Sequence, residues 1–481
     1  MELSSPTRGD RPLSVRPNAD VSLECLTTAG LAGSDVAAWD RSKPRTTGGF
    51  AEDRGIFVRY WHLAESLVAR LPKKAQRRAA EQAAADTIKQ QARAARVQFL
   101  KAHGERLYDS LTHERSEFLR LDELARAASV AVPGLVPTPE QLKVENGLPL
   151  REKEGVEIDQ GLFLSAVLAG ERSGNHICHA MLLPHRETRE LLPKFVKSGV
   201  LDLETASVTR KNHSAVVTVH NPRYLNAEDE TTINAMEICV DIALLDPTTS
   251  VGVLRGGLVD HSKYKDRRVF GAGINLTHLY EGRIPYLWYL RRDLGFVHKL
   301  YRGLARPDSL PDDVTGDTIE KPWIAAVEAF AIGGHCQLLL TMDYVIAERD
   351  AFMTLPARKE GIIPGMANMR LPRLTGDRIA RQAIQSERRL ACDSPEGRLI
   401  CDEIVDPGTM DTAIDRVVEG LSSSGVISAA ANRRAFRVAQ EPLDMFRSYC
   451  AVYARDQAFC HFSPALIANL ERHWIAQHRN F

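Results

Sequence analysis

The sequence predicts an α/β fold with helical segments on both sides. From about residue 213, short β-branched runs alternate with helix-like runs, a pattern typical of strands layered with helices. Before that point the chain is rich in helix-forming residues, and it becomes helical again after residue 421. A chain of 481 residues is long enough for two domains.

The first part of the chain divides into a leader and a helical domain. Residues 1–50 are rich in Ser, Pro, Arg, Gly and Asp, so we expect a flexible leader or an arm that orders on a partner. Residues 75–103 contain strong helix formers and neither Gly nor Pro. A connector rich in breakers, VPGLVPTPEQ, follows at 132–141. We therefore predict a mostly helical N-terminal domain over residues 51–205.

Residues 206–420 are expected to form the α/β core. In order, we predict a strand in HSAVVTVHNP, a helix in TTINAMEICVDIALLD, a strand in SVGVLRGGLVD, a helix in YLWYLRRDLGFVHKLYRGL, a strand in WIAAVEAFAIG, a short helix in HCQLLLTM and a strand in YVIAE. The last segment, residues 421–481, is helical again, and we expect it to serve packing or oligomerisation.

Composition excludes several classes of protein. Lys plus Arg and Asp plus Glu each total 62, and this zero net charge argues against a nucleic-acid or anionic-membrane binder. No apolar run approaches the roughly 20 residues that a bilayer span needs. The N-terminus, MELSSPTRGDRPLSV, lacks the apolar region of a secretory signal. The eight cysteines form no CxxC pair, which favours free thiols in the cytoplasm.

Two glycine turns follow strand-like runs, and they carry the functional argument. The first is RRVFGAGINL (267–276) and the second is AFAIGGHCQLLL (329–340). Neither is a GxGxxG fingerprint, because Leu276 stands where the third glycine would be, so a dinucleotide site is disfavoured. Each turn taken alone is equally well explained as an ordinary tight turn.

Together with their neighbours, the two turns resemble motifs of the crotonase (enoyl-CoA hydratase/isomerase) superfamily. FGAGINL resembles its F-x-A-G-x-D-L segment, and AIGGHCQ with LPARKEGIIPG resembles its G-G-G-C-E and P-E-x-x-x-G-x-x-P-G segments. HNPRYLNA resembles the strand and turn that hold coenzyme A, and LICDEIVDP resembles G-L-V-D-x-V-V-P. The resemblance spans about residues 213–410. It implies a crotonase-like spiral of ββα units that assembles as trimers or pairs of trimers.

The resemblance also implies how the turns act. In this family the carbonyl oxygen of an acyl-CoA thioester accepts two backbone N–H bonds, which stabilise the enolate. By position, the donors here are the N–H groups of Ile274 and Gly334. Loss of one such donor typically raises the barrier by about 2.7–4 kcal/mol.

Both acid/base positions of the hydratases are changed in this sequence. The first catalytic Glu corresponds to Gln337 and the second to Ala357. Hydration needs a base for water and an acid for carbon, so simple hydratase chemistry is not expected. The alternative is that acid and base come from elsewhere in the chain. Glu360 is three residues beyond the second position and is expected to be displaced from it.

What remains is enolate stabilisation beside an apolar surface. Leu276, Ala357, Ile362 and Ile363 suggest a small dry pocket that could hold dioxygen, although each alone is equally well a core residue. The N-terminal extension, KPWIAAVEAFAIGGHCQLLLTMDY and the tail NRRAFRVAQEPLDMFRSYCAVYAR resemble the cofactor-independent dioxygenases of this superfamily. That resemblance implies an arylacetyl-CoA substrate, dioxygen as co-substrate, an arylglyoxylate and free coenzyme A as products, and a role in antibiotic biosynthesis. An acyl-CoA isomerase, hydratase or hydrolase, or a non-catalytic acyl-CoA-binding protein, remains the alternative.

Polar side chains near the two turns are the remaining candidates. Gln337 can donate and accept, so we expect it to orient the peroxide or the thioester. Four further residues are substrate-binding candidates, each with a solvated surface residue as the alternative: Arg223 for a phosphate, Glu228 and His261 in the substrate pocket, and Arg292 (or its neighbour Arg291) for the aryl hydroxyls. The histidines of HICH (176–179) and His185 lack a completing ligand pattern, so no metal is predicted.

Overall fold

The computed structural model describes residues 23–312, 314, 316–423 and 426–474, and the chain divides into two compact units. Among the described residues, unit 1 comprises those up to 177 with 280–287 and 450–472, and unit 2 comprises those in 178–279 and 288–449 with 473 and 474. The predicted fold class is confirmed, because helices dominate both ends of the chain and strands alternate with helices between them.

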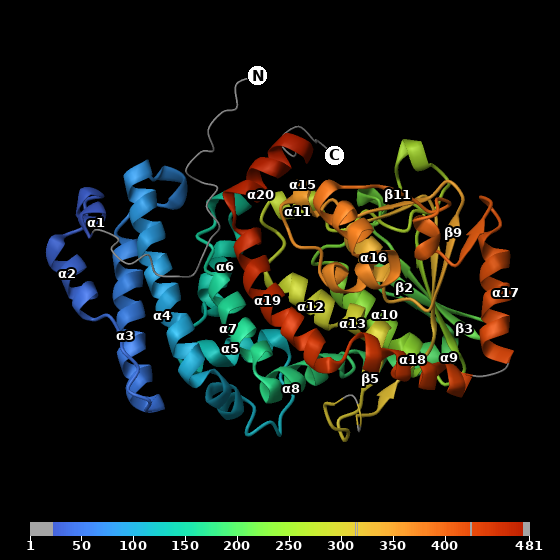
Figure 1. Cartoon of the computed structure of the whole chain (residues 1–481), viewed down its shortest axis with the longest axis horizontal. Coiled ribbons are helices and arrows are strands. Elements are labelled where there is room, and N and C mark those ends of the chain that lie inside the picture. The colour runs from blue at the N-terminus through green and yellow to red at the C-terminus, as the bar shows by residue number, and fades with distance from the viewer. Residues whose placement is uncertain (1–22, 313, 315, 424–425, 475–481) are drawn as a thin grey trace. The chain divides into compact units, whose positions relative to one another are not determined.

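Unit 1 is built from helices (Figure 1). They are α1 (Glu24–Thr28), α2 (Gly33–Arg41), α3 (Phe50–Ala69), α4 (Ala79–Leu111), α5 (Leu121–Ala131), α6 (Pro139–Asn146), α7 (Ile158–Ala169) and α20 (Pro464–Asn469). Two further helices, α8 (Glu171–Leu182) and α19 (Leu443–His461), contribute residues to both units. The predicted run of strong helix formers becomes α4, which continues through Leu111.

Aromatic side chains form the centre of the α3–α4 packing. The rings of Phe57, Trp61 and Phe99 are all buried and lie 5.4–5.7 Å apart. Beside them, His103 Nε2 lies 2.6 Å from Asp53 Oδ2, and both side chains are buried. Each side chain thus has a hydrogen-bond partner, which offsets the free-energy cost of burying the imidazole and the carboxylate in an apolar core.

Part of the predicted leader is helical. Leu26, Val36 and Trp39 on α1 and α2 are buried, and the Trp39 ring stacks on Tyr60 of α3 at 5.5 Å. This differs from the loose arm predicted over residues 1–50, because these apolar side chains gain a packing partner. Residues 1–22, the rest of that prediction, lie outside the described residues.

Unit 2 contains a mixed sheet of seven strands. Their order is β1 (Val200–Asp202), β2 (Ala206–Lys211), β3 (Ser214–Val219), β4 (Val251–Gly256), β7 (Trp323–Val327), β9 (Tyr344–Glu348) and β12 (Glu403–Val405). The first three strands pair antiparallel, and every pair from β3 to β12 is parallel. Two small sheets accompany it: β11 (Leu390–Ala391), β10 (Phe352–Thr354) and β8 (Phe330–Ile332), and β5 (Leu304–Ala305) with β6 (Thr318–Ile319).

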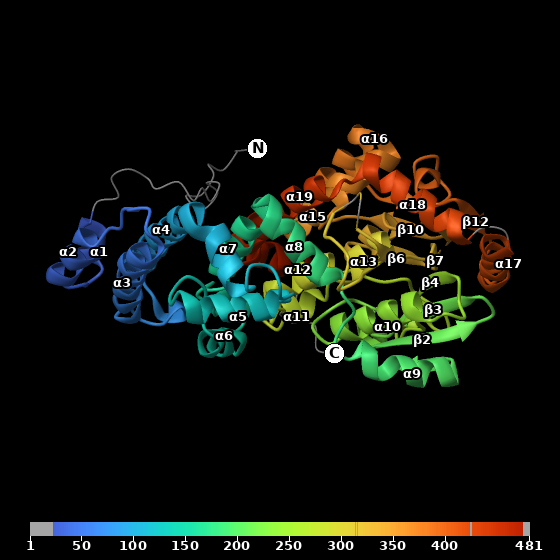
Figure 2. The same cartoon turned by 90° about the horizontal axis from the view of Figure 1, so that it is seen from below.

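Helices cover the large sheet. In Figure 2, α9 (Thr188–Ser198) and α10 (Ile233–Leu245) lie beside β2 and β3. On the strands β4, β7, β9 and β12, apolar side chains pack against α17 (Met410–Ser423) in one buried cluster. Because α9 packs on α10 and β1, unit 2 begins upstream of the predicted boundary at residue 206. The other helices of this unit include α13 (Phe296–Arg302), α16 (Ala367–Ser386) and α18 (Val426–Gln440).

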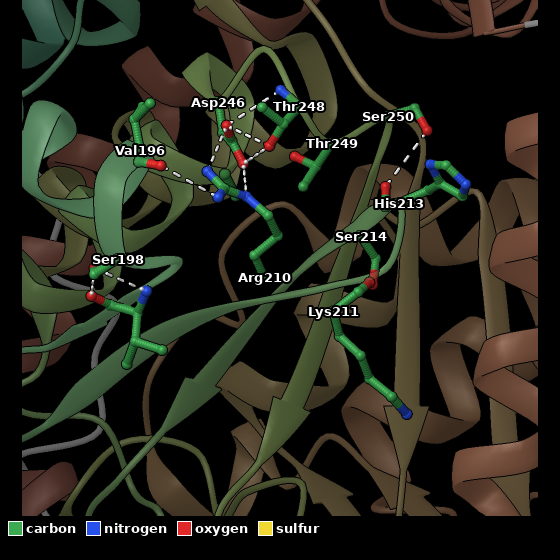
Figure 3. Close-up of polar contacts among 12 residues, drawn as sticks. Val196, Ser198, Arg210, Lys211, His213, Ser214, Asp246, Thr248, Thr249 and Ser250 are labelled. Atoms are coloured by element: carbon green, nitrogen blue, oxygen red, sulfur yellow. Dashed lines mark hydrogen bonds and ion pairs between the residues drawn. The ribbon is translucent and has the colours of Figure 1, made fainter.

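A bidentate ion pair joins β2 to the end of α10. Arg210 donates from Nε and Nη2 to the two carboxylate oxygens of Asp246, at 2.9 and 3.0 Å (Figure 3). The hydroxyl of Thr248 also donates to this carboxylate. Burial alone would raise the pKa of Asp246, but these hydrogen bonds lower it, so the carboxylate remains ionised at neutral pH.

Two predicted elements are each divided in the structure. Gly295 separates α12 (Leu287–Leu294) from α13 within the predicted long helix. The predicted strand in WIAAVEAFAIG breaks at Ala329, whose φ of 62° is incompatible with a continuous strand. As a result β8 leaves the main sheet and pairs with β10, which determines where the second glycine turn lies.

Candidate functional site

The two glycine turns lie beside each other in unit 2. The first turn runs along β8, because the Gly271 N–H donates to Phe330 O at 3.3 Å and the Ile332 N–H donates to Gly271 O at 3.0 Å. A Cβ atom placed on Gly273 would lie 3.2 Å from the nitrogen of Gly334. The structure therefore brings the two turns together as the sequence predicts.

Each turn presents one unused backbone donor. Gly334 is the first residue of α14 (Gly334–Leu339), so its N–H has no acceptor within the helix. The flanking groups are occupied: the Gly333 N–H donates to Thr354 O, and the Asn275 N–H donates to Glu228 O. Neither the Ile274 N–H nor the Gly334 N–H donates to another residue in the described ranges. Such a pair can receive the oxygen of a carbonyl or an enolate.

His335 holds the first turn in place, and sequence reasoning missed it. Its Nδ1 accepts a hydrogen bond from the Gly273 N–H at 3.0 Å, which fixes the Ala272–Gly273 peptide, one peptide before the one that carries the Ile274 N–H. The ring occupies the space where a Cβ of Gly271 would be, 2.2 Å from the nearest ring atom, so only glycine fits there. Burial lowers the pKa of His335 to about 4, so the ring is neutral and can accept this bond at neutral pH. Its place directly after the Gly-Gly pair was the available signal.

Arg292, on α12, is the centre of a buried polar cluster beneath the second turn. Its Nε and Nη2 bind the carboxylate of Glu228, and Nη1 donates to Asp293 Oδ1 at 2.9 Å. The remaining N–H groups donate to Gln337 Oε1 at 3.0 Å and to Gly334 O at 2.8 Å. All five guanidinium N–H groups are therefore used within the protein.

This arrangement limits how the cluster could receive an aryl hydroxyl. Burial lowers the pKa of Arg292, but the carboxylates of Glu228 and Asp293 raise it above its ordinary value overall, so the guanidinium stays charged. Arg292 has no N–H left to donate, whereas the oxygens of Glu228 have lone pairs that can accept from a phenol. Arg291, the alternative candidate, instead pairs with Glu230 near the surface at 2.5 Å.

The amide of Gln337 has a defined orientation. Arginine carries only donors, so the atom of Gln337 that faces Arg292 at 3.0 Å must be the oxygen Oε1. The Nε2 group then points away from Arg292, and no described residue accepts a hydrogen bond from it. Gln337 therefore keeps two N–H donors for a molecule bound at the turns.

Glu360 is not displaced from the site as the sequence analysis expected. It ends the short helix α15 (Ala357–Glu360), and its Oε1 lies 3.9 Å from the position of a Cβ on Gly333. One turn of helix turns the side chain back toward the glycine pair, although the residue is three positions beyond Ala357. Burial, and secondarily the nearby carboxylate of Glu387, raise the pKa of Glu360 to about 7.

The residues of the predicted oxygen pocket lie on the segments that flank the turns. Leu276 begins α11 (Leu276–Tyr280), two residues after Ile274, and is half-buried. Ala357 is buried, and its carbonyl accepts from the Ile362 N–H at 3.3 Å. Ile362 and Ile363 are half-buried. A cavity for dioxygen among these residues stays a prediction.

Two candidates lie outside the buried cluster. His261 is exposed; its Nδ1 accepts from the Lys263 N–H at 3.2 Å, and its ring lies 5.7 Å from that of Tyr264. Arg223 is exposed in the turn HNPRYLNA. In that turn the Asn226 amide donates to Gly257 O and Val269 O, so the segment is attached to the sheet. Contact of His261 or Arg223 with a substrate stays a prediction.

Two features are absent from the described ranges. No group of three or more His, Cys, Asp or Glu side chains in those ranges is arranged to hold a metal ion. No helix in them is long and apolar enough to cross a bilayer.

Comparison with known proteins gives four relevant similarities. Residues 309–443 match the model of the family described as enoyl-CoA hydratase/isomerase. The chain is 48% identical over 407 residues to the (3,5-dihydroxyphenyl)acetyl-CoA 1,2-dioxygenase of Amycolatopsis orientalis. This alignment covers 84% of this chain and 92% of that protein. It is 26% identical over 239 residues to the carnitinyl-CoA dehydratase of Salmonella paratyphi A, covering 50% of this chain and 82% of the relative. Among solved structures, an enoyl-CoA hydratase from Mycobacterium avium subsp. paratuberculosis aligns with a TM-score of 0.46 and 19% identity, covering 56% of this chain and 98% of that one.

Proposed function

Because the chain belongs to the crotonase (enoyl-CoA hydratase/isomerase) superfamily, we propose that it is a dioxygenase acting on an arylacetyl-CoA thioester. The proposed reaction converts (3,5-dihydroxyphenyl)acetyl-CoA and dioxygen to 3,5-dihydroxyphenylglyoxylate and coenzyme A. The observation that carries this proposal is the 48% identity to a dioxygenase of that substrate over 92% of its length. The retained pair of backbone donors, with no carboxylate at positions 337 and 357, supports it.

In the proposed mechanism the two turns stabilise an enolate. The thioester oxygen accepts hydrogen bonds from Ile274 and Gly334, so negative charge that develops when the α-proton leaves meets preorganised donors. Glu228, held by Arg292, accepts a hydrogen bond from a ring hydroxyl and orients the aryl group. With Gln337 where the hydratases have a carboxylic acid, no acid at that position returns a proton to the carbanion.

The electron-rich enolate then reduces dioxygen. Transfer of one electron and recombination form a C–O bond at the α-carbon and give a peroxide. The distal peroxide oxygen attacks the thioester carbonyl, and coenzyme A leaves as the thiolate, which takes up a proton. The second α-proton is then lost as the O–O bond breaks, and the electron pair of that C–H bond forms the α-keto group. One oxygen atom becomes the α-keto group and the other enters the carboxylate, so the atoms balance without a further reductant. The Nε2 donors of Gln337 would stabilise the peroxide anion.

Several further properties belong to the same proposal. The substrate supplies the electrons, so the enzyme would need neither metal nor organic cofactor. We also propose a cytoplasmic homo-oligomer, a trimer or a pair of trimers, with a role in antibiotic biosynthesis. Bound dioxygen would lie beside Leu276, Ala357 and Ile362.

Oxygen-electrode measurements with (3,5-dihydroxyphenyl)acetyl-CoA test the proposal. We expect one dioxygen consumed per coenzyme A released, and both atoms of ¹⁸O₂ recovered in the arylglyoxylate. Activity should survive exhaustive chelation with no stoichiometric metal. Thioester hydrolysis without oxygen uptake would favour a hydrolase, and tight binding without turnover would favour a non-catalytic acyl-CoA-binding protein. Either result would overturn the dioxygenase proposal.

A further inference from the structure

The space above the second glycine turn has two defined borders. A Cβ built on Gly333 meets only two heavy atoms within 4 Å beyond its chain neighbours: the Cα of Gly273 at 3.7 Å and Oε1 of Glu360 at 3.9 Å. The first glycine turn is thus on one side of this space and a carboxyl group on the other. Gly333 directly precedes the Gly334 donor in the chain, and Gly273 directly precedes the Ile274 donor.

We infer that Glu360 is the base that removes the α-proton of the acyl-CoA, an assignment that rests on the proposed enolate chemistry. A thioester oxygen about 2.9 Å from the Gly334 nitrogen has its α-carbon two bonds away, within reach of the space that Gly333 and Glu360 border. The α-C–H bond breaks, the proton moves to a carboxylate oxygen of Glu360, and the electron pair is delocalised onto the thioester oxygen.

The other ionisable groups around the turns are poorly suited to this step. Glu228 and Asp293 already accept hydrogen bonds from the guanidinium of Arg292, which occupy carboxylate oxygens that a base would need. His335 already accepts the Gly273 N–H through Nδ1. Among the described residues, no group donates a hydrogen bond to the carboxylate of Glu360, so its lone pairs are available.

The surroundings of Glu360 suit a general base. Its pKa of about 7 places the titration near the operating pH, where a general base is both ionised and strong enough to take a proton. The charged group that faces it is Glu387, just after α16, and Glu387 in turn lies 3.4 Å from Arg358. Glu360 is half-buried, and a proton captured by its carboxyl group would exchange with water between turnovers. That exchange makes the step measurable without oxygen.

The test is anaerobic exchange of the α-hydrogens of (3,5-dihydroxyphenyl)acetyl-CoA in D₂O, followed by mass spectrometry. Glu360→Gln keeps the shape of the side chain and removes its basicity, and we expect exchange to fall at least 100-fold. Glu360→Asp, which keeps a carboxylate but withdraws it by one methylene, should show an intermediate rate. Calorimetric binding of a non-reactive thioester analogue should be unchanged in both variants, which verifies a folded site.

A second variant tests the same assignment without changing Glu360. The exchange rate of the wild type should fall as the pH drops through about 7, because Glu360 must be ionised to act. Glu387→Gln removes the neighbouring negative charge, so the pKa of Glu360 should fall and the acidic limb should move to lower pH. An acidic limb that does not move in this variant would count against the assignment.

The outcomes separate this inference from the proposed dioxygenase function. If the wild type consumes oxygen and Glu360→Gln still exchanges at the wild-type rate, the base is another group and the inference is overturned. If the wild type exchanges but consumes no oxygen, and Glu360→Gln does not exchange, the base assignment stands and the dioxygenase function fails. Absence of exchange in the wild type would overturn both.

Discussion

Arg292 donates from Nη1 to Oε1 of Gln337 at 3.0 Å, and this contact determines which end of the amide faces Arg292 and which end faces away from it. A glutamate at 337 would also bind Arg292, but both of its outer atoms would then be acceptors when ionised. Glutamine instead offers N–H donors to the bound molecule and has no proton to give to a carbanion. A glutamine at 337 thus agrees with chemistry in which the enolate reacts with dioxygen before it is protonated.

Gln337→Glu should therefore impair oxygenation more than enolate formation. Loss of hydrogen bonds to an anionic peroxide, each typically about 1.5–3 kcal/mol, predicts a fall in kcat of roughly 10- to 100-fold. Anaerobic α-hydrogen exchange should fall much less, because the Ile274 and Gly334 donors remain. Oxygen uptake and exchange are measured on the same preparations.

Gln337→Met is the matched control for charge at this position. Methionine is similar in size but has no N–H donor, so oxygen uptake should fall as it does in Gln337→Glu. Normal uptake in the methionine variant would show that Gln337 does not hydrogen-bond to the reacting oxygen.

Glu228→Gln should weaken recognition of the ring hydroxyls. The variant keeps the shape but loses the charged acceptor, so the preference in kcat/KM for the 3,5-dihydroxyphenyl over the unsubstituted phenylacetyl thioester should fall about 10-fold or more. Because Arg292 would lose its bidentate partner, urea unfolding should also show a loss of about 3–5 kcal/mol, the typical cost of breaking a buried pair. An unchanged substrate preference in a folded variant would exclude Glu228 as the ring contact.

His335 predicts a pH dependence of stability. The folded pKa, about 4, lies below the ordinary value of 6.5, so the unfolded chain binds a proton more readily between these values. Stability from this group is therefore complete above pH 6.5 and is lost as the pH falls toward 4. By linkage the loss at pH 5 is about 2 kcal/mol.

His335→Gln removes that titration while offering a side-chain oxygen as an acceptor. The difference in unfolding free energy between pH 8 and pH 5, measured by urea titration, should be about 2 kcal/mol smaller in the variant. Other titrating groups are common to both proteins and cancel in this comparison. Identical pH dependence of the two proteins would mean that His335 is not held neutral.

The sequence allowed local features to be predicted and left the long-range contacts open. The strand β3 could be predicted because its β-branched run is contiguous, and the donor positions Ile274 and Gly334 could be assigned through the family resemblance of two contiguous segments. The partners of Arg292 could not be predicted in the same way. Arg292 is 64 residues from Glu228 and 45 residues from Gln337 in the sequence. Contacts between residues so far apart leave no pattern in the neighbouring sequence.

Glu360 shows a different limit of the sequence. Its distance along the chain from Ala357 suggested displacement, yet the single turn of α15 brings its carboxyl back to Gly333. A spacing of three residues means opposite things in an extended segment and in a helix. The sequence LPARKEG does not by itself decide between these conformations.

The last prediction concerns the route of dioxygen. If dioxygen waits beside Ala357 and Ile362, the space there must be small, apolar and unblocked. Ala357→Phe, or Ile362→Phe, should fill it and raise the apparent KM for oxygen, while KM for the thioester changes little because the two backbone donors are untouched. Overpacking at these positions typically costs about 1–3 kcal/mol of stability, so thermal unfolding is measured in parallel.

Leu421→Phe is the matched comparison, since it adds bulk to a half-buried side chain of α17 that is not among the residues of the predicted pocket. Oxygen-electrode kinetics at saturating thioester separate the positions. If the pocket is formed as predicted, the Phe variants at Ala357 and Ile362 should need a higher oxygen concentration to reach half of their maximal rate. A general loss of packing would instead lower kcat at every oxygen concentration. An oxygen dependence identical to the wild type in well-folded Ala357 and Ile362 variants would place the oxygen site elsewhere.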